Sequence, residues 1–587
     1  MSLLKDLSQR FGDAFEAAGV DRSAGLVVPS QRPELAQYQC NGALAVAKRA
    51  GRNPRDLAQA VLDGLMDREI FASLDIAGPG FINITVTDEY LAGNAQAMED
   101  GARCGIGAPD PKRKVLVDYG GPNMSKSMHV GHLRASIIGE SLKRLFRVAG
   151  HEVDGDIHMG DWGMPIGQLI IELERRQPDL PYFDADLAGP YPEDSPVTLD
   201  DLSEMYPIVV ERCRNEPEEA ERARQATFDL QNGRAGYLAL WRHYHDVSVA
   251  EQKKDFAALG VEFDLWRGES TVHDRLAPLV DQLTDDGLAI ESDGAIVVQV
   301  EKDSDKTEMP PLLLTRSDGS YLYSTTDLAT LDQRVDEGYD LVLYVVDARQ
   351  GLHFEQVFRA ARLAGIASES VGLEHTAFGT VNGPDGTPFK TREGGVLRLA
   401  DLMKIVTDAA RTRLDEAEIA QDYPDEERDR IARQVGLGAL KFGDLSNHRT
   451  SNYIFDLDRF TSFEGKTGPY LQYGAVRIKS ILRRAGEAGL TPGPIVAPTV
   501  DQERGLILRL LLLPEVIERA VDVRAPNVLT EYAYEVATDF NRFYEACHIL
   551  REEDPIRQAS WLSLVDLTLR VLTLLLDTLG IEVPGRM

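Results

Sequence analysis

Residues 115–150 constrain the fold of this chain more than any other stretch. The first three form a short apolar run followed by Asp118, which predicts a buried strand ending at this aspartate. A loop of small residues comes next, and from Leu133 apolar side chains recur at helical spacing until Gly150. The stretch therefore predicts a strand, a loop and a helix. The loop N–H groups and the positive helix end suit an anion such as a nucleotide phosphate.

Two imidazoles lie in this loop, His129 and His132, with Gly131 directly before the second. A histidine N–H can donate to phosphate oxygens, and a glycine lets a base or ribose come close to the backbone. A short H-x-G-H pattern also occurs by chance, as a loop with two incidental histidines. The surrounding strand, loop and helix favour a nucleotide site.

The segment from His129 to His132 resembles the HIGH signature of class I aminoacyl-tRNA synthetases. The longer string DYGGPNMSKSMHVGHLR, from Asp118 to Arg134, is similar to the version found in arginyl-tRNA synthetases, and the similarity recurs in blocks almost to the C-terminus. This resemblance implies that His129, Gly131 and His132 contact ATP, and that both histidines take part in catalysis.

Pattern and resemblance together predict an α/β fold. Its centre is a Rossmann-like, doubly wound parallel-sheet catalytic domain with a helical insertion, flanked by an N-terminal α+β domain and a C-terminal all-α anticodon-binding domain. We expect the domains at residues 1–105, 106–400 with the insertion at about 166–290, and 401–587. In the family the N-terminal domain meets the outer corner of the tRNA.

Within these domains the pattern predicts individual elements. The first domain shows helical patterns at 3–18 and 34–71 and a strand entered near residue 81. The second half of the sheet begins with a strand at 321–323, a helix from Asp327 and a strand at 341–346. Alternating strands and helices imply parallel pairing, with ligands beyond the carboxyl ends of the strands. Beyond residue 400 only amphipathic helices are expected.

Length and net charge limit the number of domains and the kinds of partner we expect. The chain has 587 residues, too many for one core, and its 63 Lys+Arg against 95 Asp+Glu give a net charge of −32. Such a charge argues against nucleic acid unless the cations gather on one local face. The acid excess is consistent with solubility or a saline cytoplasm.

Cysteine usage and apolar stretches point to the cytoplasm. The four cysteines lie far apart without a C-x-x-C pair, so we expect neither a structural zinc site nor a disulfide framework. The N-terminus lacks the apolar core of a signal peptide, and the longest apolar stretches are too short or are broken by arginine. We expect a soluble, cytoplasmic monomer without a membrane partner and without a metal site of its own.

Amino-acid activation joins two anions, so ATP should arrive with Mg²⁺ and meet basic side chains. The glycine-bounded loop at 386–395 carries two cations and, taken alone, is equally a solvent turn. It resembles the family's KMSKS loop loosely: Phe389, Lys390 and Thr391 stand where Met-Ser-Lys is usual, so one lysine is missing. Arginyl-tRNA synthetases with a degenerate KMSKS loop commonly carry a lysine at the position of Lys126. We expect Lys126 to compensate for the missing lysine of the loop. The resemblance thus assigns ATP binding to Lys126, Phe389, Lys390 and Thr391 as well. It also implies a catalytic role for Lys126 and Lys390.

An arginine substrate needs carboxylates and carbonyl acceptors around its five-donor guanidinium. Taken singly, each acid is equally compatible with a helix cap or a surface charge. The chemistry of the pocket alone would also permit lysine as the substrate. The resemblance selects arginine, with Asp118 reading the α-amino group and Tyr323 and Asp327 reading the guanidinium. The expected pocket comprises Asp118, Asn123, Tyr323, Asp327 and Gln350.

The C-terminal helices mix cations with aromatics, which suits an exposed RNA loop but also an ordinary helical bundle. The resemblance to an anticodon-binding domain favours tRNA, with Asn83, Tyr470 and Arg477 as candidate contacts.

We therefore expect an arginine–tRNA ligase, which forms arginyl-adenylate from L-arginine and ATP, releases pyrophosphate and charges the 3′-terminal ribose of tRNA(Arg). One alternative is an adenylate-forming ligase or nucleotidylyltransferase of the same superfamily, which would not need the helical C-terminal region. Another is an inactive RNA-binding paralogue, against which the intact His129 and His132 argue. A dehydrogenase is excluded because no G-x-G-x-x-G follows a predicted strand.

Overall fold

The computed structural model describes residues 2–32, 34–125, 128–317, 319–383, 386–387 and 397–587. The chain divides into two compact units, which are described separately. One comprises residues 1–110, 148–150 and 463–587, and the other residues 111–147 and 151–462. The second unit contains the HIGH-like segment.

A four-stranded parallel sheet forms the centre of the second unit, in the order β11-β10-β5-β6. The strands are β5 (Lys114–Asp118), β6 (Glu152–Asp156), β10 (Leu341–Tyr344) and β11 (Gly372–His375). From β5 the chain crosses to β6 on one side, and from β10 it crosses to β11 on the other, so the winding reverses between β5 and β10. Ligands bind at such a switch point, beyond the carboxyl ends. The predicted doubly wound sheet is confirmed.

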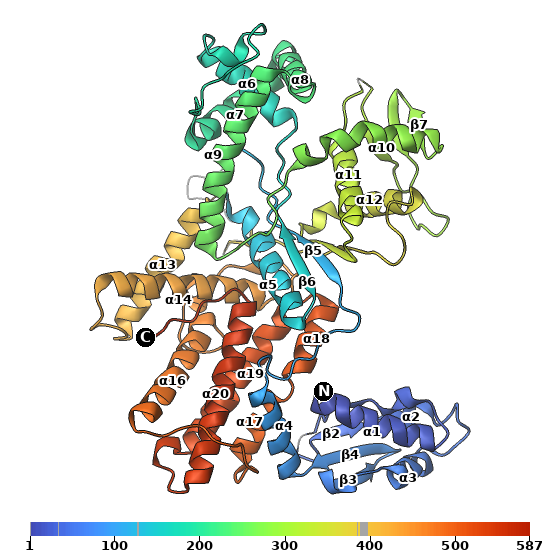
Figure 1. Ribbon diagram of the computed structural model, residues 1–587, viewed down its shortest axis with the longest axis vertical. Helices are drawn as coiled ribbons and strands as arrows, with labels where there is room; N and C mark the ends of the chain where they lie inside the picture. Colours follow the sequence, from blue (N-terminus) through green and yellow to red (C-terminus); the bar gives the residue numbers. More distant parts are fainter. Residues whose placement is uncertain (1, 33, 126–127, 318, 384–385, 388–396) are drawn as a thin grey trace. The chain divides into compact units, whose positions relative to one another are not determined.

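The local sequence explains the central strand and helix. Val115, Leu116 and Val117 in β5 are fully buried, as expected for a parallel strand covered on both faces. Helix α5 (Leu133–Ala149) follows the HIGH-like segment and lies against β5 and β6 (Figure 1). Gly150 ends it at φ +104°, a conformation that favours glycine. These elements agree with the prediction.

The predicted strand at 321–323 is wrong. Tyr323 begins helix α11 (Tyr323–Asp336), and the strand nearby is β9 (Leu312–Thr315). The hydroxyl groups of Ser324 and Thr325 donate to the carbonyls of Leu313 and Leu314, which ties the helix start to β9. β9 belongs to a separate antiparallel sheet with β7 (Ala289–Ser292) and β8 (Ala295–Val298).

Helices make up most of the remaining second unit (Figure 1). The predicted insertion is helical, with α6 (Met164–Arg176), α7 (Leu199–Asn215), α8 (Pro217–Gln231), α9 (Ala235–Leu259) and α10 (His273–Asp285). Helix α12 (Gly351–Leu363) connects β10 to β11, and α13 (Leu399–Glu416), α14 (Asp425–Leu445) and α15 (Leu457–Phe460) follow the sheet. The expectation of helices alone beyond residue 400 is wrong at β13 (Tyr453–Ile454), which pairs in parallel with β12 (Val381–Asn382).

The first unit begins with an antiparallel sheet in the order β1-β2-β4-β3. Its elements are α1 (Leu3–Ala17), β1 (Val27–Pro29), β2 (Tyr38–Cys40), α2 (Gly42–Val46), α3 (Pro54–Gly64), β3 (Phe71–Ala77), β4 (Phe81–Val86) and α4 (Asp88–Asp100). The predicted helix at 34–71 is therefore wrong at β2. There Tyr38 and Cys40 are buried and flank a half-buried Gln39, an alternation that fits a strand.

The C-terminal part of this unit is a helical bundle of α16 (Gly468–Glu487), α17 (Asp501–Leu510), α18 (Leu513–Val523), α19 (Asn527–Ala546) and α20 (Pro555–Thr578). Helix α20 is long and apolar enough to cross a membrane, but 67% of its most apolar window is buried inside the protein, as in a bundle core. The N-terminal module packs on this bundle. Arg504 in α17 forms two hydrogen bonds of 2.7 Å with the carboxylate of Asp88 in α4.

Candidate active site

The HIGH-like segment folds as a short 3-10 turn, Val130–His132, between β5 and α5. Nδ1 of His129 accepts the N–H of Gly131 at 3.0 Å, and Nδ1 of His132 accepts the N–H of His129 at 3.1 Å. The two rings lie 4.0 Å apart. Because each Nδ1 is an acceptor, the neutral rings carry their hydrogen on Nε2. A Cβ on Gly131 would lie 2.7 Å from the His129 ring, so a larger residue here would displace that ring.

Backbone hydrogen bonds tie this segment to the chain that follows the 386–395 loop. The N–H of Val130 donates to Leu397 O at 3.0 Å, and the N–H of Leu399 donates to Met128 O at 3.0 Å. The chain that resumes at Leu397, after the candidate phosphate loop, is therefore joined directly to the HIGH-like turn. Lys126, Phe389, Lys390 and Thr391 themselves lie outside the described residues.

Directly after the turn, Arg134 enters a buried ion pair. Its Nε lies 3.1 Å from Asp444 of α14, and its Nη1 donates to Ser451 O at 2.9 Å. The hydroxyl of Tyr453 in β13 donates to the same carboxylate at 2.8 Å. Burial raises the pKa of Asp444, and Arg134 opposes that rise. The start of α5 is thereby anchored to α14 and β13.

Asp118 ends β5 and takes part in a second buried cluster. Nη2 of Arg334, on α11, lies 2.7 Å from Asp118 and 2.9 Å from Asp156, the last residue of β6. Burial raises the pKa of Asp118, and Arg334 is the strongest opposing influence. The predicted amino-group ligand thus lies at the switch point, already paired with a guanidinium.

Tyr323 and Asp327 come together as the helical spacing predicted. They lie one turn apart on α11, and both contact His353 of α12. Nε2 of His353 is 2.6 Å from the Asp327 carboxylate, and the rings of His353 and Tyr323 are 4.8 Å apart. Tyr323 is 60% exposed, so its ring is accessible to a substrate.

Glu269 is a carboxyl group that the sequence analysis missed. Burial raises its pKa to about 7, and the negative charges of Asp327 and Asp161 add to that rise. Asp161 holds the same turn by accepting the N–H and hydroxyl of Ser270 at 2.9 and 2.6 Å. Glu269 lies in the insertion, where its spacing from the other pocket residues carries no local signal. Two acids, Glu269 and Asp327, therefore influence one another at this place.

Asn123 and Gln350 lie in loops that follow strands of the parallel sheet, and both are exposed. Asn123 forms a parallel bridge to Gly160, and a Cβ on Gly160 would lie 2.6 Å from Asn123 Oδ1. Gln350 ends the 3-10 turn Ala348–Gln350 after β10. The structure records no direct side-chain hydrogen bond from either of these two described residues to Asp327.

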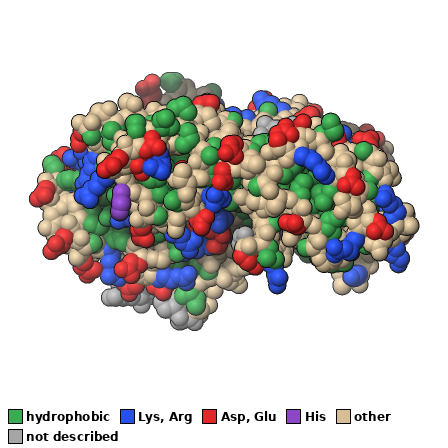
Figure 2. All heavy atoms as spheres, turned by 90° about the horizontal axis from the view of Figure 1, so that it is seen from below, with side chains coloured by type: hydrophobic (Ala, Val, Ile, Leu, Met, Phe, Trp, Pro, Cys, Tyr) green, Lys and Arg blue, Asp and Glu red, His purple; other side chains and the backbone are tan. Residues whose placement is uncertain are grey.

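The candidate tRNA contacts belong to the first unit. Tyr470 Oη accepts a hydrogen bond from Asn541 at 2.9 Å, and the Arg477 guanidinium lies 5.9 Å from the Tyr473 ring. Asn83 in β4 accepts one from Gln39 at 2.9 Å. Figure 2 shows acidic and basic side chains interspersed over the face it presents, with no continuous basic surface there.

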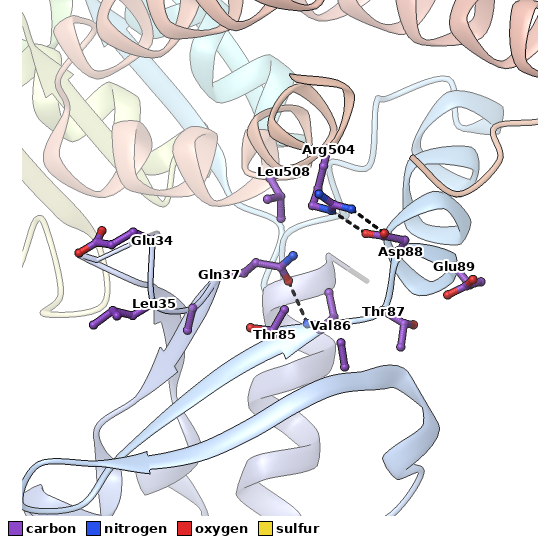
Figure 3. Close-up of a pocket in the computed structure, with 12 residues that line it drawn as sticks. Glu34, Leu35, Gln37, Thr85, Val86, Thr87, Asp88, Glu89, Arg504 and Leu508 are labelled. Atoms are coloured by element: carbon purple, nitrogen blue, oxygen red, sulfur yellow. Dashed lines mark hydrogen bonds and ion pairs between the residues drawn. The ribbon is translucent and has the colours of Figure 1, made fainter. Parts of the chain in front are cut away.

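A cavity of about 610 Å³ lies in the first unit, between the N-terminal module and α17 (Figure 3). Its lining includes Glu34, Asp88 and Glu89, while its one cation, Arg504, is paired with Asp88. This acidic lining does not suit ATP phosphates, and no residue of the HIGH-like turn contributes to it. Among the described residues, no group of three or more His, Cys, Asp or Glu could hold a metal ion.

Three family models match successive parts of the chain. Residues 96–457 match tRNA synthetases class I (R), catalytic domain; residues 471–587 match the DALR anticodon binding domain; residues 3–86 match the arginyl tRNA synthetase N terminal domain. Among curated proteins, the arginine–tRNA ligase of Maricaulis maris is 50% identical, and that of Alkaliphilus oremlandii 48% identical, each with both chains covered completely.

Solved structures agree. The arginyl-tRNA synthetase of Plasmodium falciparum superposes with a TM-score of 0.82 at 25% identity, covering 100% of this chain and 99% of its own. The Thermus thermophilus enzyme gives a TM-score of 0.79 at 24% identity with full coverage of both chains, which supports the fold. The HIGH-like turn at the switch point and the full-length matches thus lead to one conclusion: the chain belongs to the arginine–tRNA ligase family, within the class I aminoacyl-tRNA synthetases.

Proposed function

We propose that this enzyme activates L-arginine with ATP and transfers the arginyl group to the 3′-terminal ribose of tRNA(Arg). The observation that carries the proposal is the HIGH-like turn beside the switch point of a parallel sheet whose neighbouring helix bears Tyr323 and Asp327. The function follows from this site together with family membership, because a fold alone hosts many reactions.

At the ATP end, His129 and His132 donate from Nε2 to phosphate oxygens, and Gly131 leaves room for the nucleoside. ATP enters with Mg²⁺, which offsets charge on the phosphates. Lys126 and Lys390 neutralise the charge that develops on the leaving pyrophosphate, while Phe389 and Thr391 belong to the same loop. The hydrogen bonds of Leu397 and Leu399 to Val130 and Met128 support this assignment, because both leucines closely follow the loop in the sequence.

At the arginine end, Asp118 receives the α-ammonium, and Tyr323 and Asp327 receive the guanidinium. Asn123 and Gln350 supply amide groups at the rim. Glu269 adds a second carboxylate for the guanidinium, since its charge and that of Asp327 repel one another. A bound guanidinium, with five donors, relieves this repulsion, whereas lysine offers a single ammonium.

Beyond the active site, Asn83, Tyr470 and Arg477 contact tRNA. The chain works as a monomer in the cytoplasm, with the three domains bounded near residues 105 and 400. No structural zinc is required.

The test is ATP–pyrophosphate exchange with arginine or lysine, each with and without tRNA, followed by charging of tRNA(Arg). We expect exchange to depend on arginine and on tRNA, and lysine to give background. Exchange with another amino acid, or transfer to an acceptor other than tRNA, would support the adenylate-forming alternative. RNA binding without exchange would identify an inactive paralogue.

A further inference from the structure

The cluster at the carboxyl ends of β5 and β6 has more acid than base. Asp118 and Asp156 are register partners at the ends of adjacent strands. Both accept hydrogen bonds from a single atom, Nη2 of Arg334, at 2.7 and 2.9 Å. Two carboxyl groups therefore share one guanidinium, so the cluster has one more acid than it has cations.

Other charges near the cluster do not supply the missing cation. Tyr344 lies against the guanidinium, 5.1 Å from ring to Cζ, but burial raises its pKa to about 12, so it is neutral. His158 is the other titratable group whose positive charge acts on Asp118, but among the described residues it forms no ion pair with either carboxylate. Oδ1 of Asp156 is buried without a hydrogen-bond partner among the described residues. A buried, unmatched carboxylate is costly, which favours a cation that arrives from outside.

Burial determines where such a cation can enter. The side chains of Arg334 and Asp156 are each 1% exposed, while that of Asp118 is 10% exposed. Within the cluster, Asp118 is thus the most exposed member, at the strand end where the proposed function places the amino acid.

We propose that Arg334 and Asp156 are positioning residues for the amino-acid site. Because Arg334 bonds to both Asp118 and Asp156, Asp118 is only partly neutralised. The α-ammonium of the substrate then binds Asp118 and completes the cluster. This inference rests on the proposed function and adds to it the origin of the preference for a free α-amino group. Without Asp156, Arg334 pairs with Asp118 alone, and the attraction for the ammonium weakens.

The test compares L-arginine with 5-guanidinovalerate, which is arginine without its α-amino group, as substrate and competitive inhibitor in tRNA-supported exchange. In Asp156→Asn, we expect the preference for arginine to fall by about tenfold or more, while the inhibition constant of 5-guanidinovalerate changes little. In Arg334→Lys, which keeps the charge but loses the planar fork, the preference falls less. Thermal melts establish that each variant is folded.

Asp154→Asn is the matched control. Asp154 lies on the same face of β6, two residues before Asp156, and accepts a hydrogen bond from Tyr339 at 2.7 Å. Its variant should keep the wild-type preference. A wild-type preference in Asp156→Asn would overturn the inference, even if Arg334→Lys fails to fold. Absence of arginine-dependent exchange in the wild type would instead reject the proposed function.

Discussion

Nε2 of His353 lies 2.6 Å from the carboxylate of Asp327, so the acid expected to read the guanidinium is held by a side chain from the neighbouring helix. We predict that Asp327→Asn raises the arginine KM at least tenfold, because losing a desolvated charged partner costs roughly 2–5 kcal/mol. Steady-state exchange measures this, with the ATP KM unchanged. Asp332→Asn is the control, since Asp332 is on the same helix but pairs with Arg275 at the surface. An unchanged arginine KM would remove Asp327 from the pocket.

The arginine KM should depend on pH through Glu269. Its pKa of about 7 means that it is largely protonated below that pH and ionised above it. Because the guanidinium binds the ionised form better, the KM should fall as pH rises from 6 to 8 and then level off. Glu269→Gln should show a higher KM at pH 8 and no such fall. The same pH profile in both proteins would contradict the assignment.

Glu269 should also make the stability of the protein depend on pH. Its pKa is raised from 4.5 in the unfolded chain to about 7 in the folded protein. The stabilisation from its protonation is therefore complete below pH 4.5 and is lost as pH rises toward 7. Relative to wild type, Glu269→Gln should gain thermal stability at pH 8, where the buried charge is absent from the variant.

Local patterns predicted the elements whose burial is encoded in consecutive residues. The apolar run of β5 and the helical repeat of α5 are examples. Residues 321–323 were misassigned because the start of α11 depends on hydroxyl contacts to β9, which no periodicity reveals. The same distinction holds for the residues of the candidate arginine pocket. Tyr323 and Asp327 share a helix face, whereas Glu269 reaches the site from the insertion. Arg334 lies on the same helix as Asp327, but its pairing with Asp118 and Asp156 joins residues far apart in the sequence.

The ion pair between Arg134 and Asp444 should be needed for both stability and activity. Arg134→Met leaves a buried carboxylate unpaired, a change that typically costs about 3–5 kcal/mol. We expect a lower Tm and weaker exchange, because the residue lies directly after the HIGH-like turn. The double variant Arg134→Met, Asp444→Leu should regain much of the Tm but not the exchange rate. Recovery of both would show that the pair is structural only.

Lys126 is the expected substitute for the lysine missing at Thr391. Lys126→Ala should lower kcat of adenylate formation by roughly 10²–10³, the typical loss for one transition-state contact, with little change in arginine binding. Lys126→Arg should recover only part of it, because a planar fork does not reproduce a point charge. Single-turnover measurement of adenylate formation at varied arginine concentration separates the loss in rate from any change in arginine binding. Near-normal exchange in Lys126→Ala would make Lys390 or Arg392, the two cations of the 386–395 loop, the leading candidates.

Ending the chain after Ser462 should abolish tRNA charging. The cut removes the whole helical bundle, and with it the partners of the N-terminal module: Glu515 for Ser2, Glu518 for Lys5 and Arg504 for Asp88. We expect loss of charging together with protease sensitivity in residues 1–110. Removing the N-terminal module as well should restore protease resistance to the remaining unit, but not charging. A truncated protein that charges tRNA normally would contradict the domain assignment.

The pairing of residues 1–110 with 463–587 in one compact unit has a consequence for biosynthesis. The N-terminal module is translated before the parallel-sheet unit, and the bundle it packs on is translated after that unit. Ser2, Lys5 and Asp88 therefore remain without these partners for most of translation. A chain interrupted before residue 463 therefore lacks these partners, and the surface of the N-terminal module that packs on the bundle stays exposed in such a fragment.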